Sequence, residues 1–148
     1  MELNILHIYP DCMSLYGEWA NVAVLTRLLE AMGAKVNVRR LLLDETPDFS
    51  DADFLYLGAG TERTQKAALT ALKDHVPALR EALDRGAVAL FTGNAMEILG
   101  KSVTDQQGKV WPGLGLAKFT TVETDRRDPE DVIAHSPLWD APVVGFMN

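Results

Sequence analysis

The sequence predicts an α/β domain in which helices flank a mostly parallel sheet in three layers, followed by a small antiparallel extension. Three observations indicate this architecture. Four short apolar runs typical of strands alternate with helical periodicity over residues 3–91. The fourth run, Ala87 to Phe91, is apolar throughout, as central strands of parallel sheets are. After Gly100 the helical pattern disappears and short strand-like segments follow one another.

The first strand is predicted at Leu3 to Tyr9, a run of strand-forming residues that ends before Pro10. Apolar residues then recur at helical spacing from Val22 to Met32, and Gly33 stands where a helix usually ends. Valines alternate with polar residues over 35–39, which predicts a half-exposed second strand.

The third strand is predicted at Phe54 to Leu57. Residues 64–85 have helical periodicity, with Pro77 dividing them into two helices and Gly86 ending the second. The stretch GAVALFTGNAMEILG, which ends at Gly100, predicts the fourth strand, a tight turn and a helix. The turn DQQG and the segments KFTTVET, DVIAHS and APVVGFMN predict the antiparallel extension.

Length and composition limit the class of protein. A chain of 148 residues is long enough for one core and short for two, so we expect a single domain over 1–148. The net charge of -7 argues against a nucleic-acid footprint, which needs a basic face. The chain has no leader-like start and no long apolar run, which predicts a cytoplasmic protein without a membrane span. The lone Cys12 excludes an internal disulfide, and we expect no metal or cofactor.

Three loops rich in small or turn-forming residues follow the predicted strands, at 10–11, 58–61 and 92–94. Ligands of open parallel sheets bind outside the carboxyl ends of the strands. The loops therefore predict one ligand crevice, although from spacing alone ordinary strand-terminating turns explain them equally well.

The strand, turn and helix predicted over 86–100 have the layout of a nucleophile elbow, in which backbone N–H groups stabilise an oxyanion. The turn carries no nucleophile, and Thr92, one residue earlier, is expected to point to the opposite face. Cys12 lies at the correct end of the sheet, but no base lies near it in sequence. His7, His75 and His135 also lack the local partners of a catalytic histidine.

Four segments carry a resemblance to a known family. IYPDCMSLYGEWANVAVLTRLLEAMG is similar to the opening of the cobyric acid synthase-like class I glutamine amidotransferases, especially the glutaminase subunits of lipid II isoglutaminyl synthase. FLYLGAGTERTQ resembles the family's glycine-rich oxyanion loop, and PGLGL and VVGFMN resemble later landmarks. The matching positions of the first segment are Tyr9, Pro10, Asp11, Tyr16, Gly17 and Asn21, and Glu18 replaces the usual Asp.

The resemblance implies a class I glutamine amidotransferase-like, flavodoxin-like fold. It also implies an activity: family members attack glutamine with an elbow cysteine, form a thioester and release ammonia to a synthetase partner, which can be Mur-ligase-like. Aligned on Leu99-Gly100, Gly93 takes the place of the cysteine and Glu97 that of a glutamine. Glycine offers no atom for covalent catalysis, so no catalytic residue is intact and we expect the glutaminase reaction to be abolished.

The family's catalytic histidine is expected beyond the last segment, and the sequence stops at Asn148, which implies a C-terminally truncated homologue. If the sequence is part of a longer product, the loss of the histidine is an artefact. The loss of the nucleophile cysteine at Gly93 remains in either case. The resemblance implies that glutamine or a small polar ligand is bound by Gly58, Ala59, Gly60, Thr61, Asn94 and Arg127. For Arg127 a solvated charged loop is the competing explanation.

The favoured hypothesis is a pseudo-glutaminase that acts as a binding or partner subunit. The alternative is an active hydrolase or amidotransferase that uses a nonstandard nucleophile such as Cys12. A third possibility is a truncated product that folds without a role. Ending at VVGFMN is expected to leave an unpaired sheet edge or an exposed apolar face, which predicts a homodimer formed through that region.

Overall fold

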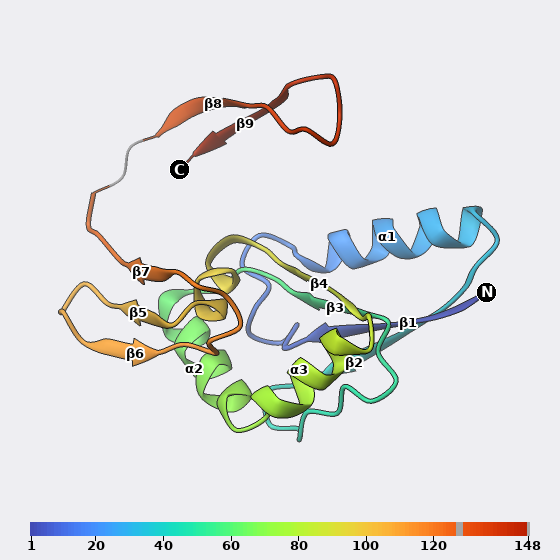
Figure 1. Cartoon of the computed structure of the whole chain (residues 1–148), viewed down its shortest axis with the longest axis horizontal. Coiled ribbons are helices and arrows are strands. Elements are labelled where there is room, and N and C mark those ends of the chain that lie inside the picture. The colour runs from blue at the N-terminus through green and yellow to red at the C-terminus, as the bar shows by residue number, and fades with distance from the viewer. Residues whose placement is uncertain (127–128, 148) are drawn as a thin grey trace.

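The computed structural model describes residues 1–126 and 129–147, and its centre is a four-stranded parallel sheet. The strands lie in the order β2-β1-β3-β4 (Figure 1). They are β1 (Glu2–Ile8), β2 (Lys35–Leu41), β3 (Phe54–Leu57) and β4 (Val88–Phe91). All neighbouring pairs are parallel, which confirms the predicted fold class and the four predicted strands.

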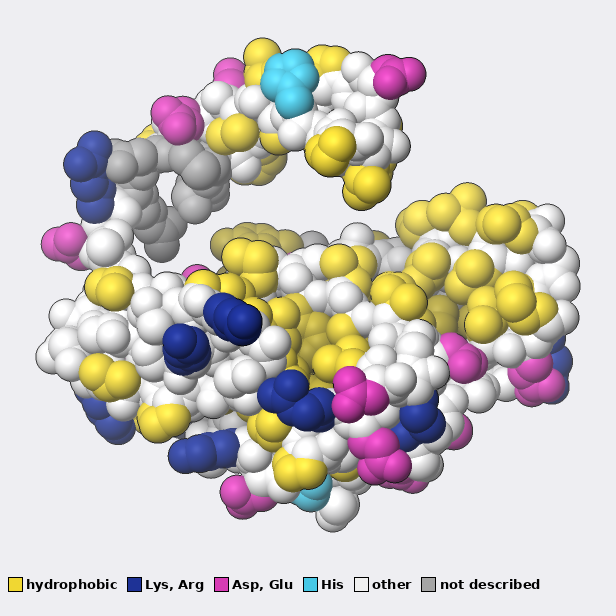
Figure 2. All heavy atoms as spheres, viewed as in Figure 1, with side chains coloured by type: hydrophobic (Ala, Val, Ile, Leu, Met, Phe, Trp, Pro, Cys, Tyr) yellow, Lys and Arg dark blue, Asp and Glu magenta, His cyan; other side chains and the backbone are white. Residues whose placement is uncertain are grey.

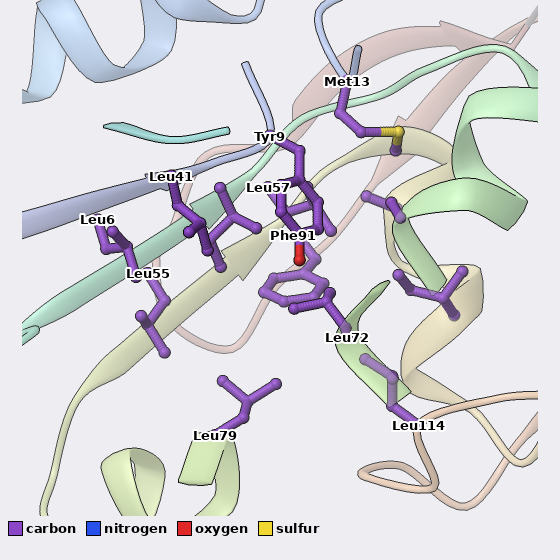
Figure 3. Close-up of a cluster of buried hydrophobic side chains, with 14 of the residues drawn as sticks. Leu6, Tyr9, Met13, Leu41, Leu55, Leu57, Leu72, Leu79, Phe91 and Leu114 are labelled. Carbon is purple, nitrogen blue, oxygen red and sulfur yellow. The ribbon is translucent and has the colours of Figure 1, made fainter. Parts of the chain in front are cut away.

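Helices cover both faces of this sheet (Figure 1). Helix α1 (Trp19–Ala31) packs Val22 against Ile5 and Tyr56 on one face. Helices α2 (Glu62–Lys73) and α3 (Val76–Asp84) pack against the other. Side chains alternate along a strand, so the residues next to Ile5 and Tyr56 point into this second, larger core. Its strand residues include Leu6, Leu55, Leu57 and Phe91, and Leu72 and Leu79 meet them from the helices (Figure 3).

The predicted helix boundaries are confirmed where proline or glycine sets them. Pro77 lies in the first turn of α3, where its missing N–H costs nothing, and so separates α3 from α2. Gly33 and Gly86 follow α1 and α3 with φ of 89° and 103°, a left-handed conformation that glycine adopts without strain. The Thr61 hydroxyl caps α2 by accepting a hydrogen bond from the Thr64 N–H at 3.2 Å.

The prediction that β4 is buried on both faces is wrong. Among the described residues β4 is an edge strand, and Val88 and Leu90 are 58% and 45% exposed. Helix α1 packs over β1 and β3 and leaves these two side chains uncovered. An apolar sequence shows that a strand suits burial on both faces, but not which elements cover it.

The prediction of a helix after the fourth strand is also wrong. Two short 3₁₀ turns, η1 (Gly93–Ala95) and η2 (Glu97–Leu99), follow β4. The PGLGL segment competes for the carbonyls that a helix would use: Leu114 donates to the Ile98 carbonyl at 2.8 Å, and Leu116 donates to the Leu99 carbonyl at 2.9 Å. These long-range bonds end the helical turn before it can propagate.

The extension beyond Gly100 comprises two small sheets. Strands β5 (Ser102–Thr104) and β6 (Val110–Pro112) form the hairpin predicted around DQQG. Strand β7 (Thr120–Val122) pairs parallel with β5, so this sheet is mixed rather than wholly antiparallel. Strands β8 (Glu130–Ala134) and β9 (Val143–Met147) form a separate antiparallel hairpin (Figure 1). Within the described residues, no helix is long and apolar enough to cross a bilayer.

Candidate functional site

The loops that follow β1, β3 and β4 meet in one cleft. Its volume is about 540 Å³, and its lining residues are Leu15, Tyr16, Ala59, Gly60, Thr61, Glu62, Gly93 and Asn94. Six of these were singled out from the sequence: four as binding residues, Gly93 as the nucleophile position and Tyr16 as a position that matches the family. Gly58 lies buried behind the cleft, and Arg127 lies outside the described residues. Tyr16 and Glu62 are lining residues that the sequence-based binding set lacked.

Gly93 has the backbone geometry of an elbow without a reactive side chain. Its φ is +55°, the left-handed region in which a side chain is strained. A Cβ atom built there would lie 2.9 Å from the Ala59 Cβ, on the neighbouring loop. The turn therefore presents exposed backbone to the cleft where the resemblance places a thiol.

The glycines of the 58–60 loop are required by protein packing. A Cβ at Gly58 would lie 2.5 Å from the Glu18 Cβ, and one at Gly60 would lie 2.5 Å from the Met13 Sδ. The sequence indicated that these glycines let backbone approach a ligand. In the structure they also let the loop approach the 13–18 segment, which forms another wall of the cleft, and the approach of a ligand stays a prediction.

Asn94 fastens two walls of the cleft together. The Gly60 N–H donates to its Oδ1 at 3.0 Å, and its Nδ2 donates to the Gly60 carbonyl at 2.8 Å. Both polar backbone groups of Gly60 are thereby paired within the protein. Gly60 and Asn94 each lie three residues beyond the paired Leu57 and Phe91, so parallel register alone would have predicted their proximity. From the sequence, Asn94 was predicted to bind a ligand.

We expect Asn94→Ala to lower the free energy of unfolding by about 2 kcal/mol, because two hydrogen bonds are lost and the Gly60 backbone groups lose their partner. Urea denaturation measures this loss, and faster hydrogen exchange of the Gly60 amide would accompany it. Asn37→Ala is the matched control, since the Asn37 amide makes its hydrogen bonds on the exposed surface. Equal stability of both variants would contradict a fastening role for Asn94.

A chain of polar contacts continues from Asn94 toward the extension. The fully buried Gln65 donates from Nε2 to the Asn94 carbonyl at 2.6 Å and to Glu97 Oε2 at 2.7 Å. Gln65 accepts from Lys66, which also forms an ion pair with Glu123 just beyond β7. Burial raises the pKa of Glu97 despite the opposing hydrogen bond from Gln65. This network ties the elbow to the mixed sheet.

A second polar cluster lies under the cleft around Glu18, which is 8% exposed. Its Oε2 accepts hydrogen bonds from the Tyr56 hydroxyl at 2.6 Å, the Asn21 amide at 3.2 Å and the Thr92 hydroxyl at 3.2 Å. Thr92 therefore points away from the elbow turn, as its strand position predicted. Burial, and next the Glu18 hydrogen bond, raise the pKa of Tyr56. The cluster joins the first loop to β3 and β4.

Tyr9 sets the direction in which the chain leaves β1 and enters the first loop of the cleft. It is a non-glycine residue with a φ of 53°, is fully buried, and ends β1 at the point where the chain turns into the cleft wall. Figure 3 shows its ring among the leucines of the larger core, beside Phe91. A strained conformation of this kind persists only where surrounding packing determines it.

The pKa values of Cys12 and His7 are both shifted so that each side chain is neutral at pH 7. Burial, with a smaller contribution from Asp11, raises the pKa of Cys12 to about 11, so the thiol is protonated at neutral pH. His7 is buried against Tyr56, with ring centroids 5.3 Å apart, and burial lowers its pKa to about 4. No cluster of three or more His, Cys, Asp or Glu side chains suited to a metal ion occurs within residues 1–126 and 129–147.

We expect alkylation of Cys12 by iodoacetamide at pH 8 to be on the order of 100-fold slower than in the urea-unfolded protein, because only the thiolate reacts. The rate should rise steeply as the pH approaches 11. Mass spectrometry of timed samples measures both rates. A folded-state rate equal to the unfolded one would show an activated thiol.

The chain is similar to known proteins over nearly its whole length. The model of the CobB/CobQ-like glutamine amidotransferase domain matches residues 4–146. Subunit GatD of the glutamine-hydrolyzing lipid II isoglutaminyl synthase of Staphylococcus aureus (strain N315) is 29% identical over 147 residues, which cover 99% of this chain and 60% of that protein. The subunit GatD of Streptococcus pneumoniae (strain ATCC BAA-255 / R6) is 29% identical over 152 residues, covering 99% and 57%.

The chain thus spans about three fifths of the length of the curated relatives it matches. The relatives and the family model agree with the resemblance of the four sequence segments. Because the family model extends over almost the whole chain, the chain belongs to the CobB/CobQ-like glutamine amidotransferase domain family.

Proposed function

We propose that this protein is a pseudo-glutaminase: a binding subunit that keeps the family's cleft and does not hydrolyse glutamine. The observation that carries the proposal is Gly93. It occupies the elbow turn with a φ of +55° and contributes no side-chain atom that could attack an amide carbon.

The hydrogen bonding of the cleft supports the same proposal. An oxyanion site needs backbone N–H groups aimed at the reacting oxygen. The Gly60 N–H already donates to the Asn94 side chain at 3.0 Å, so it is not free to receive an oxyanion. The glycine-rich loop therefore keeps its shape, but the Gly60 N–H is used in a hydrogen bond within the protein.

The competing hypothesis of a nonstandard nucleophile is less well supported. The pKa of Cys12 is raised to about 11, whereas nucleophilic cysteines have lowered values. Its thiol also packs against the larger core and is absent from the cleft lining.

The proposed ligand is a small polar molecule of amino-acid size, glutamine included. A volume of about 540 Å³ suits such a ligand, and Tyr16, Thr61 and Glu62 offer polar groups at the lining. The two relatives are named as subunits of a lipid II isoglutaminyl synthase. We therefore extend the proposal to a synthetase partner, such as a Mur-ligase-like enzyme.

Calorimetric titration with L-glutamine, with ammonia release followed in parallel, tests this function. The expected result is saturable binding without ammonia, with weaker binding to Tyr16→Ala, whose side chain is 78% exposed at the cleft. Trp139→Ala, in the remote β8–β9 loop, is the matched control and should bind as the unaltered protein does. Absence of binding would remove glutamine as the ligand, and ammonia release would overturn the pseudo-glutaminase proposal.

A further inference from the structure

We propose that two copies of this chain form a two-fold dimer in which the β8–β9 hairpin of each copy docks into an apolar groove of the other. The groove lies between α1 and the edge of the parallel sheet and has a volume of about 430 Å³. We call it the α1 groove. Its lining residues are Asn21, Val22, Val24, Leu25, Leu28, Phe54, Tyr56 and Leu90.

The α1 groove is open because one helix covers too little of the sheet. Phe54 pairs with Val88 and Tyr56 with Leu90 in register, so these four side chains share the face on which α1 lies. Helix α1 covers the β3 residues and leaves Val88 and Leu90 at the surface, while Val24 and Leu28 are 57% and 58% exposed. An apolar face of this kind on a soluble domain marks an interaction site.

The hairpin offers a matching surface. Ile133 pairs with Val144 and Asp131 with Phe146, so three apolar side chains share one face of the hairpin. Ile133, Val144 and Phe146 are 65%, 72% and 76% exposed. Figure 2 shows hydrophobic side chains gathered both over the hairpin and over the α1 end of the molecule.

Within residues 1–126 and 129–147, no hydrogen bond or salt bridge joins the β8–β9 hairpin to the parallel sheet or its helices. Figure 1 shows it standing away from the parallel sheet, on the same side as α1. A lone two-stranded hairpin is marginally stable in water, so it requires a second surface to pack against.

A second copy supplies that surface with the correct symmetry. Each chain carries one apolar hairpin and one α1 groove. When each hairpin docks into the groove of the other copy, both grooves are covered and the result is a closed dimer. The exchange forms two identical contacts between the same two chains, so both contacts contribute to one interface. The occupant of the groove is therefore the hairpin of an identical chain, independently of whether the cleft binds glutamine.

Light scattering after size exclusion tests the oligomeric state. The unaltered chain should be a dimer, and Leu28→Asp or Phe146→Asp should weaken dimerisation at least about 10-fold, because each places a charge in the contact. Both side chains are exposed, so these variants should fold. Leu138→Asp is the matched control, since Leu138 is 80% exposed in the hairpin loop and lies off the proposed contact. A monomeric unaltered chain overturns the proposal.

Cross-linking tests the pairing itself. In a Cys12→Ser background, Leu28→Cys and Phe146→Cys proteins are mixed and treated with a short bismaleimide. The expected product is a covalent dimer that forms in the mixture and in neither protein alone. Absence of that product contradicts hairpin exchange, and so does a double variant that cross-links only within one chain, because the hairpin would then cover its own groove.

Discussion

Replacement of Gly58 by alanine should lower the free energy of unfolding by about 3 kcal/mol, the upper range for forcing atoms into a packed region. The added Cβ would lie 2.5 Å from the Glu18 Cβ and 2.8 Å from the Met13 carbonyl oxygen. Glu18 cannot move aside freely, because its carboxylate holds the Tyr56 hydroxyl at 2.6 Å. Relief of the clash therefore breaks a buried hydrogen bond.

Urea denaturation followed by circular dichroism measures this effect. Gly145→Ala is the control, because a Cβ at Gly145 meets no atom within 4 Å and its φ is not positive. The control should change stability by no more than about 0.5 kcal/mol. If the two variants were equally stable, the close packing of the 58–60 loop on the first loop would be refuted.

Acidification from pH 7 to pH 4 should remove about 3 kcal/mol of stability through His7 alone. Burial lowers the pKa of His7 from 6.5 to about 4, with a smaller effect of Arg40 in the same direction. Between these values the unfolded chain binds a proton that the folded chain does not. The stabilising contribution is therefore complete above pH 6.5 and is lost as the pH falls toward 4.

His7→Phe isolates this contribution, because phenylalanine keeps an aromatic ring against Tyr56 and does not titrate. The difference in unfolding free energy between the variant and the unaltered protein should change by about 3 kcal/mol across this pH range. Glu97, whose pKa is raised by burial, acts in the opposite direction in both proteins and cancels in the difference. A His7→Phe curve parallel to that of the unaltered protein would contradict a neutral buried His7.

The sheet was predictable because its strands are short apolar runs bounded by turn residues, and Pro77 and the glycines after α1 and α3 act locally. Prediction from local sequence pattern was wrong where segments distant in the sequence determine the structure. Leu114 and Leu116 take the carbonyls that would have continued a helix after Gly93. The exposure of Leu90 depends on how far α1 extends across the sheet, which no pattern within β4 records.

The location of the candidate site was predictable for a different reason. The carboxyl ends of parallel strands must lie at one edge, so the loops at 58–61 and 92–94 were expected to meet, and they do. The role of individual side chains was not predictable in this way. The two hydrogen bonds between the Asn94 amide and the Gly60 backbone were not foreseen, and contact of Asn94 with a ligand stays a prediction.

Ammonia release from L-glutamine tests the central claim most directly. The assay compares the unaltered protein, Cys12→Ala and the Staphylococcus aureus relative as a glutamine-hydrolyzing reference. We expect release at the rate of the protein-free blank for both the unaltered protein and the variant, because Gly93 supplies no nucleophile. Turnover of glutamine above the blank, and above all turnover that disappears in Cys12→Ala, would contradict it.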